Sequence, residues 1–196
     1  MTPRLPAWIL PLVGAVLLCA CAHGLPPMKS REQVAQEAAA RAPILQLQGQ
    51  LSIKLQAFAD QAAKGISLGF FFTGHEHIGQ LELMTAMGSQ FAQLHWNLDG
   101  AWLRDGQQEH FFYSLNDLSA QVLGEPLPLA ALMHWAQGRP APGIAPATDL
   151  GEHAFTQIGW RIDTREHAIG RLTAERAASP QQRGITLRVR LDPELP

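Results

Sequence analysis

The sequence predicts a mainly β fold, in which a curved antiparallel sheet forms an unclosed barrel and helices cover its open side. Three observations predict it. Apolar and polar residues alternate in several segments, which is the pattern of half-buried strands. Asp99-Gly100 and Asp105-Gly106 are typical of hairpin turns. A segment with helical spacing separates two groups of strands, and a long antiparallel sheet must curl and needs a cover for its apolar face.

The predicted strands follow this alternation. In the first, residues 45–56, leucine and isoleucine alternate with polar residues and Gly49 is the only gap. The other strands are identified by the same alternation or by the turn residues that flank them. They are expected at 66–72, 81–83, 92–96, around Trp102, and at 110–113, 155–163, 168–176 and 184–192.

Two helices are predicted between the strands. Ser114 is a suitable N-cap for the first, which ends at Gly124. Pro128 is placed at the first helical position of the second, which ends at Gly138. A loop follows over residues 139–151, and a further short helix is predicted over 31–42, after the capping-box residue Ser30.

The N-terminal residues have the layout of a secretory leader. Arg4 precedes an apolar run over 5–18, and the run ends in Leu18-Cys19-Ala20-Cys21, which looks like a bacterial lipobox. Ala20 is the small residue expected before the cut, so Cys21 is the predicted lipidation site. We expect a cleaved signal peptide (1–20), a lipidated tether (21–29) and a single domain (30–196). Ala22, rather than aspartate, favours the outer membrane.

A transmembrane anchor is the alternative for this segment. The run is interrupted by Pro6 and Pro11, and it is shorter than the roughly 20 apolar residues that a span needs. The pattern therefore favours the lipid anchor.

Composition narrows the function classes. The net charge is −2 and no long basic run is present, which argues against a nucleic-acid partner. Both cysteines, Cys19 and Cys21, lie in the leader region, so the body has no disulfide and no thiolate nucleophile. No catalytic constellation is evident, and we expect neither an enzyme nor a cofactor. His75-Glu76-His77 offers a weak metal pair without a third ligand, and a polar turn without metal is the preferred interpretation.

The apolar residues leave two interpretations open. Large rings occur on most predicted strands, and they form either an ordinary core or the walls of a pocket for acyl chains. Met87 is expected at the tip of the turn between the third and fourth strands, where polar residues are usual. It either contacts a membrane or partner, or folds back over the sheet edge.

Several segments in this order resemble the LolB family of outer-membrane lipoproteins, which receive other lipoproteins from the periplasmic carrier LolA and insert them into the outer membrane. The resemblance covers most of the chain after the leader. The matching segments are the lipobox at Cys21, Gly49–Lys54, Met87-Gly88-Ser89, Leu127-Pro128-Leu129, Trp135–Pro140 and Phe155–Trp160.

The resemblance implies an unclosed barrel with a helical lid over a hydrophobic cavity, and it favours the pocket over a packed core. The implied partners are LolA, a triacylated lipoprotein cargo and outer-membrane lipid, with the protein a monomer on the periplasmic face of the outer membrane. The candidates for the cavity wall and lid are Leu68, Phe70, Phe72, Leu83, Leu94, Trp96, Leu129, Leu132, Met133 and Trp135.

In the family, an exposed leucine in the loop between strands three and four drives membrane insertion. Met87 takes this place, while Ala86 and Thr85 stand where the family usually has proline and asparagine. Candidate basic groups for docking the carrier are Arg139, Arg161, Arg165 and Arg171. The alternative is an accessory outer-membrane lipoprotein with a packed core that binds a protein partner.

Overall fold

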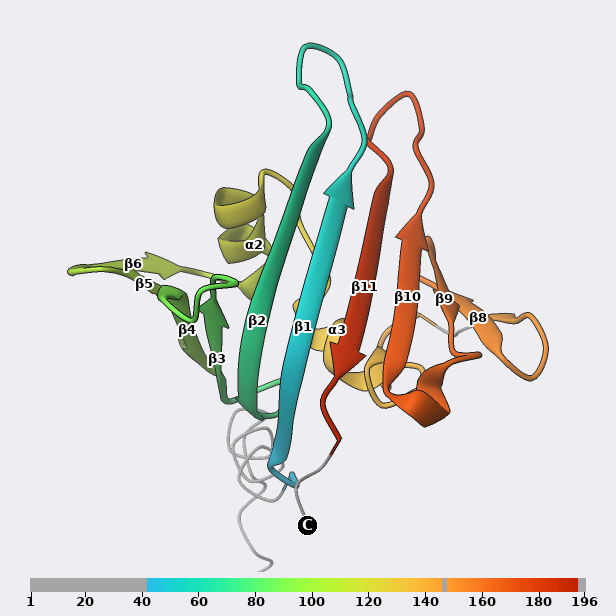
Figure 1. Ribbon diagram of the computed structural model, residues 1–196, viewed down its shortest axis with the longest axis horizontal. Coiled ribbons are helices and arrows are strands. Elements are labelled where there is room, and N and C mark those ends of the chain that lie inside the picture. Colours follow the sequence, from blue (N-terminus) through green and yellow to red (C-terminus); the bar gives the residue numbers. More distant parts are fainter. Residues whose placement is uncertain (1–41, 146–147, 194–196) are drawn as a thin grey trace, which may run out of the picture.

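The computed structural model describes residues 42–145 and 148–193. Its strands form one antiparallel sheet with the order β6-β5-β4-β3-β2-β1-β11-β10-β9-β8-β7. Within the described residues the edge strands β6 and β7 do not pair, so the barrel stays open. The sheet curves around two helices on one of its faces (Figure 1). The predicted fold class is therefore confirmed.

The strands divide into a central group and two arms. The central strands are β1 (Leu45–Leu55), β2 (Lys64–Gly74), β11 (Ile185–Leu191) and β10 (Arg171–Arg176). One arm contains β3 (Gly79–Met84), β4 (Gln90–Asn97), β5 (Gly100–Asp105) and β6 (Gln108–Phe112). The other contains β9 (Trp160–Asp163), β8 (Ala154–Gln157) and β7 (Thr148–Asp149).

The first and last strands of the sheet lie side by side at its centre. Gly49 of β1 pairs with Leu191 of β11, and the register continues to Leu55 and Ile185. A side chain at Gly49 would collide with the carbonyl oxygen of Arg190, so only glycine allows β11 to approach here. This close approach explains the gap in the alternation of the first strand.

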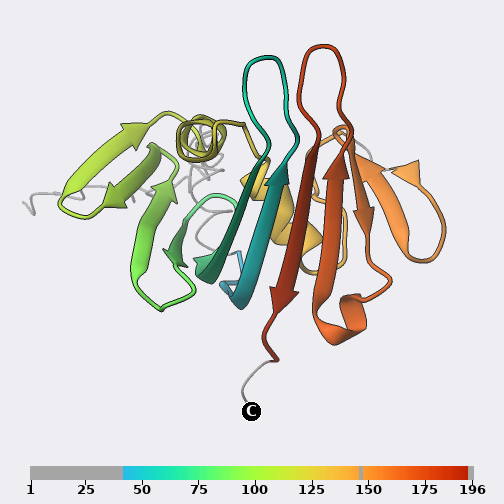
Figure 2. The same ribbon diagram turned by 45° about the horizontal axis from the view of Figure 1, so that its top comes forward.

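Two long hairpin loops extend the central strands at one end, as Figure 2 shows. Arg183, from the β10–β11 loop, is buried between them. Its guanidinium donates to the carbonyl oxygens of Gln56 (2.7 Å) and Ala62 (2.9 Å) and to Oε1 of Gln61 (2.8 Å). These charge-assisted hydrogen bonds join the two loops across the sheet.

The alternation of the sequence separates an inner from an outer face. Along β1 and β2, Ile53, Leu55, Leu68, Phe70 and Phe72 point inward and are buried, while the residues between them are more exposed. The inward side chains pack with those of the arms and helices into one core, so the helices cover the inner face.

The helices are α2 (Leu115–Leu123) and α3 (Leu129–Trp135). The Ser114 hydroxyl accepts a hydrogen bond from the backbone N–H of Asp117, and Gly124 closes α2 at φ 77°, as predicted. Pro128 is the N-cap of α3 rather than its first helical residue, and the helix ends at Trp135, before the turn that reaches Gly138. No helix among the described residues has the length and apolar character needed to cross a membrane.

Three sequence predictions need correction. Residues 155–163 form a hairpin, not one strand, because Ile158 (φ 46°) and Gly159 (φ 78°) turn the chain between β8 and β9. Residues 168–176 begin in a 3-10 helix, η1 (His167–Ile169), and β10 starts at Arg171 after Gly170. The predicted loop over 139–151 contains the short strand β7.

Other predictions fall outside the described residues. They are the signal peptide, the tether with Cys21 and, apart from its last residue, the helix over 31–42.

Candidate functional site

The candidate site is a small cavity between α3 and the inner face of the sheet. Its volume is about 90 Å³. Strands β1, β2, β3, β4 and β11 supply its walls, and α3 with the residue after it forms the lid. The lining is apolar throughout: Leu47, Leu51, Phe70, Phe72, Leu81, Trp96, Leu129, Leu132, Met133, Ala136 and Val189.

The volume shows that little free space is left between α3 and the sheet. A cavity of about 150 Å³ lined by apolar side chains is large enough for one benzene molecule. The present cavity is smaller, so it cannot hold an acyl chain as it stands. Accommodation of a long apolar ligand requires α3, or the side chains of its inner face, to move away from the sheet.

The C-terminal end of α3 is firmly attached. Trp135 is completely buried, and its indole N–H donates to Oε1 of Gln157 on β8 (2.9 Å). Oε1 of Gln157 also accepts from the Ala141 N–H (2.9 Å). The amide Nε2 of Gln157 donates to the carbonyl oxygens of Ala141 (2.9 Å) and Ala145 (3.0 Å). The amide thus makes all four hydrogen bonds that it can make.

The cavity-facing side of α3 is packed more loosely. Leu129, Leu132 and Met133 are only half-buried, although they face the sheet. Nε2 of His134 lies 2.7 Å from Oε2 of Glu76, in the turn between β2 and β3. This contact joins the lid to the rim of the sheet, while Nδ1 of His134 is buried without a hydrogen-bond partner in the described structure.

The His75-Glu76-His77 turn is not part of a metal cluster within the described residues. No group of three potential ligands occurs in the part of the chain that the structure describes. The two imidazole rings are 6.0 Å apart at a steep angle, and Glu76 contacts His134 and His77.

The predicted cavity residues divide into two sets. Six of them line the cavity: Phe70, Phe72, Trp96, Leu129, Leu132 and Met133. The other four are buried in the surrounding core: Leu68, Leu83, Leu94 and Trp135. Leu68, Leu83 and Leu94 share the inner face of the sheet with the strand residues of the first set, and Trp135 lies on α3, but none of the four lines the cavity.

Five lining residues were not predicted: Leu47, Leu51, Leu81, Ala136 and Val189. Four of them belong to predicted strands and to their apolar faces, so alternation identifies the face without showing where a void is left. Ala136 lies one position beyond α3, within the helix that the sequence predicts up to Gly138 and on the same apolar side as Leu129, Leu132 and Met133.

Met87 lies at the tip of the β3–β4 loop and is 95% exposed. The Thr85 N–H donates to the Ser89 carbonyl, and the Gly88 N–H donates to the Thr85 carbonyl, each at 2.9 Å. Gly88 has φ 79°, a conformation that favours glycine. This tight turn holds an apolar side chain in solvent, and Met87 does not fold back over the sheet edge.

The four arginines predicted to dock the carrier all follow α3 in the chain, and they lie in different structural settings. Arg139 follows α3 and donates to Oε1 of Gln137 (2.9 Å). Arg161 lies on β9 and is exposed. Arg165 donates side-chain hydrogen bonds to the Asp163 carboxylate, which lowers the pKa of Asp163. Arg171, at the start of β10, lies 3.5 Å from Glu166.

The fold and the cavity together define a class of protein: an open antiparallel barrel with an apolar cavity beneath a helical lid. A family model described as outer membrane lipoprotein LolB matches residues 45–191, which include the eleven strands and the two α-helices of the described part of the chain. The chain belongs to the LolB family.

Two relatives are both named outer-membrane lipoprotein LolB. The protein of Neisseria meningitidis is 32% identical over 116 residues, which cover 59% of this chain and 56% of that protein. The protein of Chromobacterium violaceum is 28% identical over 181 residues, which cover 92% of this chain and 94% of that protein. Family membership places the protein in the outer membrane, in agreement with the prediction from Cys21 and Ala22.

Proposed function

We propose that this protein is a non-enzymatic receptor that accepts triacylated lipoproteins from the periplasmic carrier LolA and inserts them into the outer membrane. It acts as a monomer, lipid-anchored through Cys21 on the periplasmic face, with residues 21–29 as its tether and 30–196 as one domain. The observation that carries the proposal is the wholly apolar cavity beneath α3, in a chain of the LolB family. Such a lining suits hydrocarbon and offers no polar group for another ligand.

Transfer runs downhill because apolar surface is covered at each step. Each buried methylene group contributes about 0.8 kcal/mol. A receptor that covers two or three more methylene groups than the carrier therefore gains about 2 kcal/mol, or about thirtyfold in equilibrium constant. The bilayer covers the whole chain length and is the final acceptor.

The lid must open for this exchange. Leu129, Leu132 and Met133 line the cavity and are half-buried, so displacing them exposes little surface beyond what the cargo then covers. Trp135 and Gln157 hold the end of α3 in place while the cavity-facing side chains move. The remaining core candidates, Leu68, Leu83 and Leu94, support the wall from behind.

Met87 is the residue that touches the bilayer. Its side chain is exposed at the loop tip, and its insertion brings the cavity to the membrane surface. Arg139, Arg161, Arg165 and Arg171 remain the candidates for docking the carrier.

The receptor function is tested by following a labelled cargo. The Cys21→Ala form, which lacks the anchor, is mixed with LolA that carries a labelled triacylated lipoprotein, and liposomes are added afterwards. We expect the label to move first to this protein and then to the liposomes. A folded protein that leaves the label on LolA would contradict the proposal and favour the accessory, partner-binding alternative.

Insertion is tested separately by Met87→Glu, with Met87→Leu as the matched control. Glutamate is charged and disfavours burial in hydrocarbon, so cargo should still be accepted from LolA while delivery to liposomes falls. Met87→Leu keeps an apolar side chain and should deliver at the wild-type rate. If Met87→Glu also delivers at that rate, Met87 has no insertion role.

A further inference from the structure

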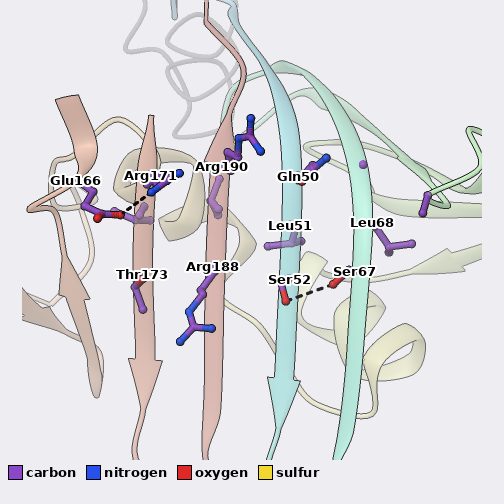
Figure 3. Close-up of a pocket in the computed structure, with 14 residues that line it drawn as sticks. Gln50, Leu51, Ser52, Ser67, Leu68, Glu166, Arg171, Thr173, Arg188 and Arg190 are labelled. Atoms are coloured by element: carbon purple, nitrogen blue, oxygen red, sulfur yellow. Dashed lines mark hydrogen bonds and ion pairs between the residues drawn. The ribbon is translucent and has the colours of Figure 1, made fainter. Parts of the chain in front are cut away.

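The outer face of the central strands carries a groove that the proposed function does not use. Its volume is about 470 Å³, and its floor is formed by β2, β1, β11 and β10. Ala86 of the β3–β4 loop lines it, and so does Glu166 in the turn after β9. Figure 3 shows the polar side chains of this groove in front of the strands, with the helices behind.

Three arginines of the groove are neighbours through the strand register. Arg190 of β11 pairs directly with Arg171 of β10, and Arg188 lies two residues before Arg190 on the same face. Like charges opposite each other on a sheet are destabilising. Glu166 lies 3.5 Å from Arg171, whereas Arg188 and Arg190 make no ion pair with any other described residue. An anion in the groove would remove the repulsion.

The rest of the groove supplies neutral hydrogen-bonding groups in the same rows. Gln50 pairs with Arg190, and Ser52 pairs with Arg188 on one side and with Ser67 on the other. The Ser67 hydroxyl donates to the Ser52 hydroxyl at 3.4 Å (Figure 3). Guanidinium forks beside hydroxyl and amide donors suit an oxyanion, above all a phosphate.

The position of the groove indicates where that phosphate comes from. Ala86, which borders the groove, is the direct neighbour of Met87, the exposed apolar residue. Surfaces that bind at a bilayer interface combine apolar insertion with cations that contact the headgroups. The overall charge of −2 gives the protein no general attraction to an anionic membrane, so any attraction must be local.

We propose that the groove binds the phosphate of an anionic phospholipid headgroup when the Met87 loop meets the membrane, with Arg188 and Arg190 as the principal contacts. The proposal rests on the proposed function only in assigning membrane contact to Met87. Headgroup binding would fix the tilt of the protein on the bilayer, and it would place the cavity opening in a constant position.

A basic residue near an anionic membrane surface strengthens binding about fivefold, so removal of two should weaken it about thirtyfold. The protein tested is the Cys21→Ala form without cargo, in cosedimentation with vesicles. One set of vesicles is phosphatidylcholine alone, and the other contains about one-third phosphatidylglycerol. The test variant is Arg188→Gln/Arg190→Gln, and the control is Lys54→Gln/Arg104→Gln, which removes two charges of the outer face that do not line the groove.

The expected result is a loss of about thirtyfold for the test variant on phosphatidylglycerol vesicles and a much smaller loss for the control. Raising the salt to about 1 M, where the Debye length is about 3 Å, should remove the preference of the wild-type protein for these vesicles. That measurement needs no variant and stands even if the double variant fails to fold.

Three results would overturn the proposal. One is equal loss in the test and control variants, which would mean a general charge effect. Another is saturable binding of inorganic phosphate with unchanged vesicle binding in the test variant, which would indicate a free-anion site. The third is normal vesicle binding with loss of uptake from LolA, which would make the groove a protein-docking surface. Because vesicle binding is measured without cargo, failure here leaves the receptor function standing.

Discussion

The two sides of helix α3 are packed in different ways. On one side, Trp135 is fully buried, and its indole N–H donates a hydrogen bond to the Gln157 side-chain amide, whose hydrogen-bonding capacity is fully used. On the other side, Leu129, Leu132 and Met133 are half-buried around a void. One short helix therefore has a side that belongs to the core and a side that lines the cavity. The core side gives the lid a fixed attachment about which the cavity-lining side chains can rearrange.

The largest loss of stability is expected for Trp135→Ala, on the core side of α3. Loss of a buried tryptophan creates a large cavity, so the free energy of unfolding should fall by about 3–5 kcal/mol. Met133→Ala, in the half-buried part, should cost much less. Urea denaturation of both variants in the Cys21→Ala background measures the difference, and equal losses would show that the two parts of α3 are packed alike.

The next largest effect is expected for Gln157→Leu. Leucine cannot replace the four hydrogen bonds, and each buried polar group left without a partner costs about 1–3 kcal/mol. The comparison is Gln137→Leu, which removes a half-buried hydrogen bond to the Met133 carbonyl and an exposed one from Arg139, and it should cost about 1 kcal/mol. A Gln157→Leu protein as stable as Gln137→Leu would mean that water or relaxation satisfies the freed groups.

Leu132→Phe changes the side of α3 that lines the cavity. The larger ring fills part of the void, so stability should change by less than about 1.5 kcal/mol while the affinity for a fluorescent fatty acid falls about tenfold. Leu115→Phe, on α2 and away from the cavity lining, is the control and should leave affinity unchanged. Fluorescence titration measures both, and the cavity is not the ligand site if the two variants bind alike.

The smallest effect on stability is expected for Glu76→Gln. The contact with His134 is partly exposed, so its loss should cost less than about 1 kcal/mol of unfolding free energy. Because it joins the lid to the sheet rim, its loss should still speed the release of a bound fatty acid in stopped-flow experiments. An unchanged release rate would exclude this contact as a fastening of the lid.

Sequence alone predicts most of the sheet, because half-buried strands such as Leu45–Leu55 show a direct alternation of apolar and polar residues. It fails where a turn hides within an apolar pattern. Ile158 occupies a positive φ that β-branched residues rarely adopt, so Gly159 is the one residue of this turn whose type favours a hairpin. The buried residues are Phe155 and Gln157 before the turn and Trp160 and Ile162 after it, so the alternation changes from odd to even positions. This change marks a turn that the prediction of one continuous strand overlooks.

The candidate site is only partly predictable for a different reason. Period-two patterns assign Leu68 and Phe70 to the same face of β2, yet only Phe70 reaches the cavity. Whether an inward residue reaches the cavity depends on the position of α3. That position is set by contacts between residues far apart in the sequence, such as the hydrogen bond from Trp135 to Gln157. For Met87, the sequence leaves two possibilities, an exposed side chain or one folded back over the sheet edge. The side chain is exposed because a short turn has few neighbouring atoms to cover its tip residue.

The pairing of β1 with β11 has a consequence for biosynthesis. Gly49 is synthesised long before its partner Leu191, so the pairing of β1 with β11 cannot form until the strands between them in the chain have all been made. Until then, β1 can pair with β2 alone and presents an unpaired edge, which is open to association with other chains. A chain shortened by its final strand would keep both helices and most hairpins and still lack the seam that joins its two halves.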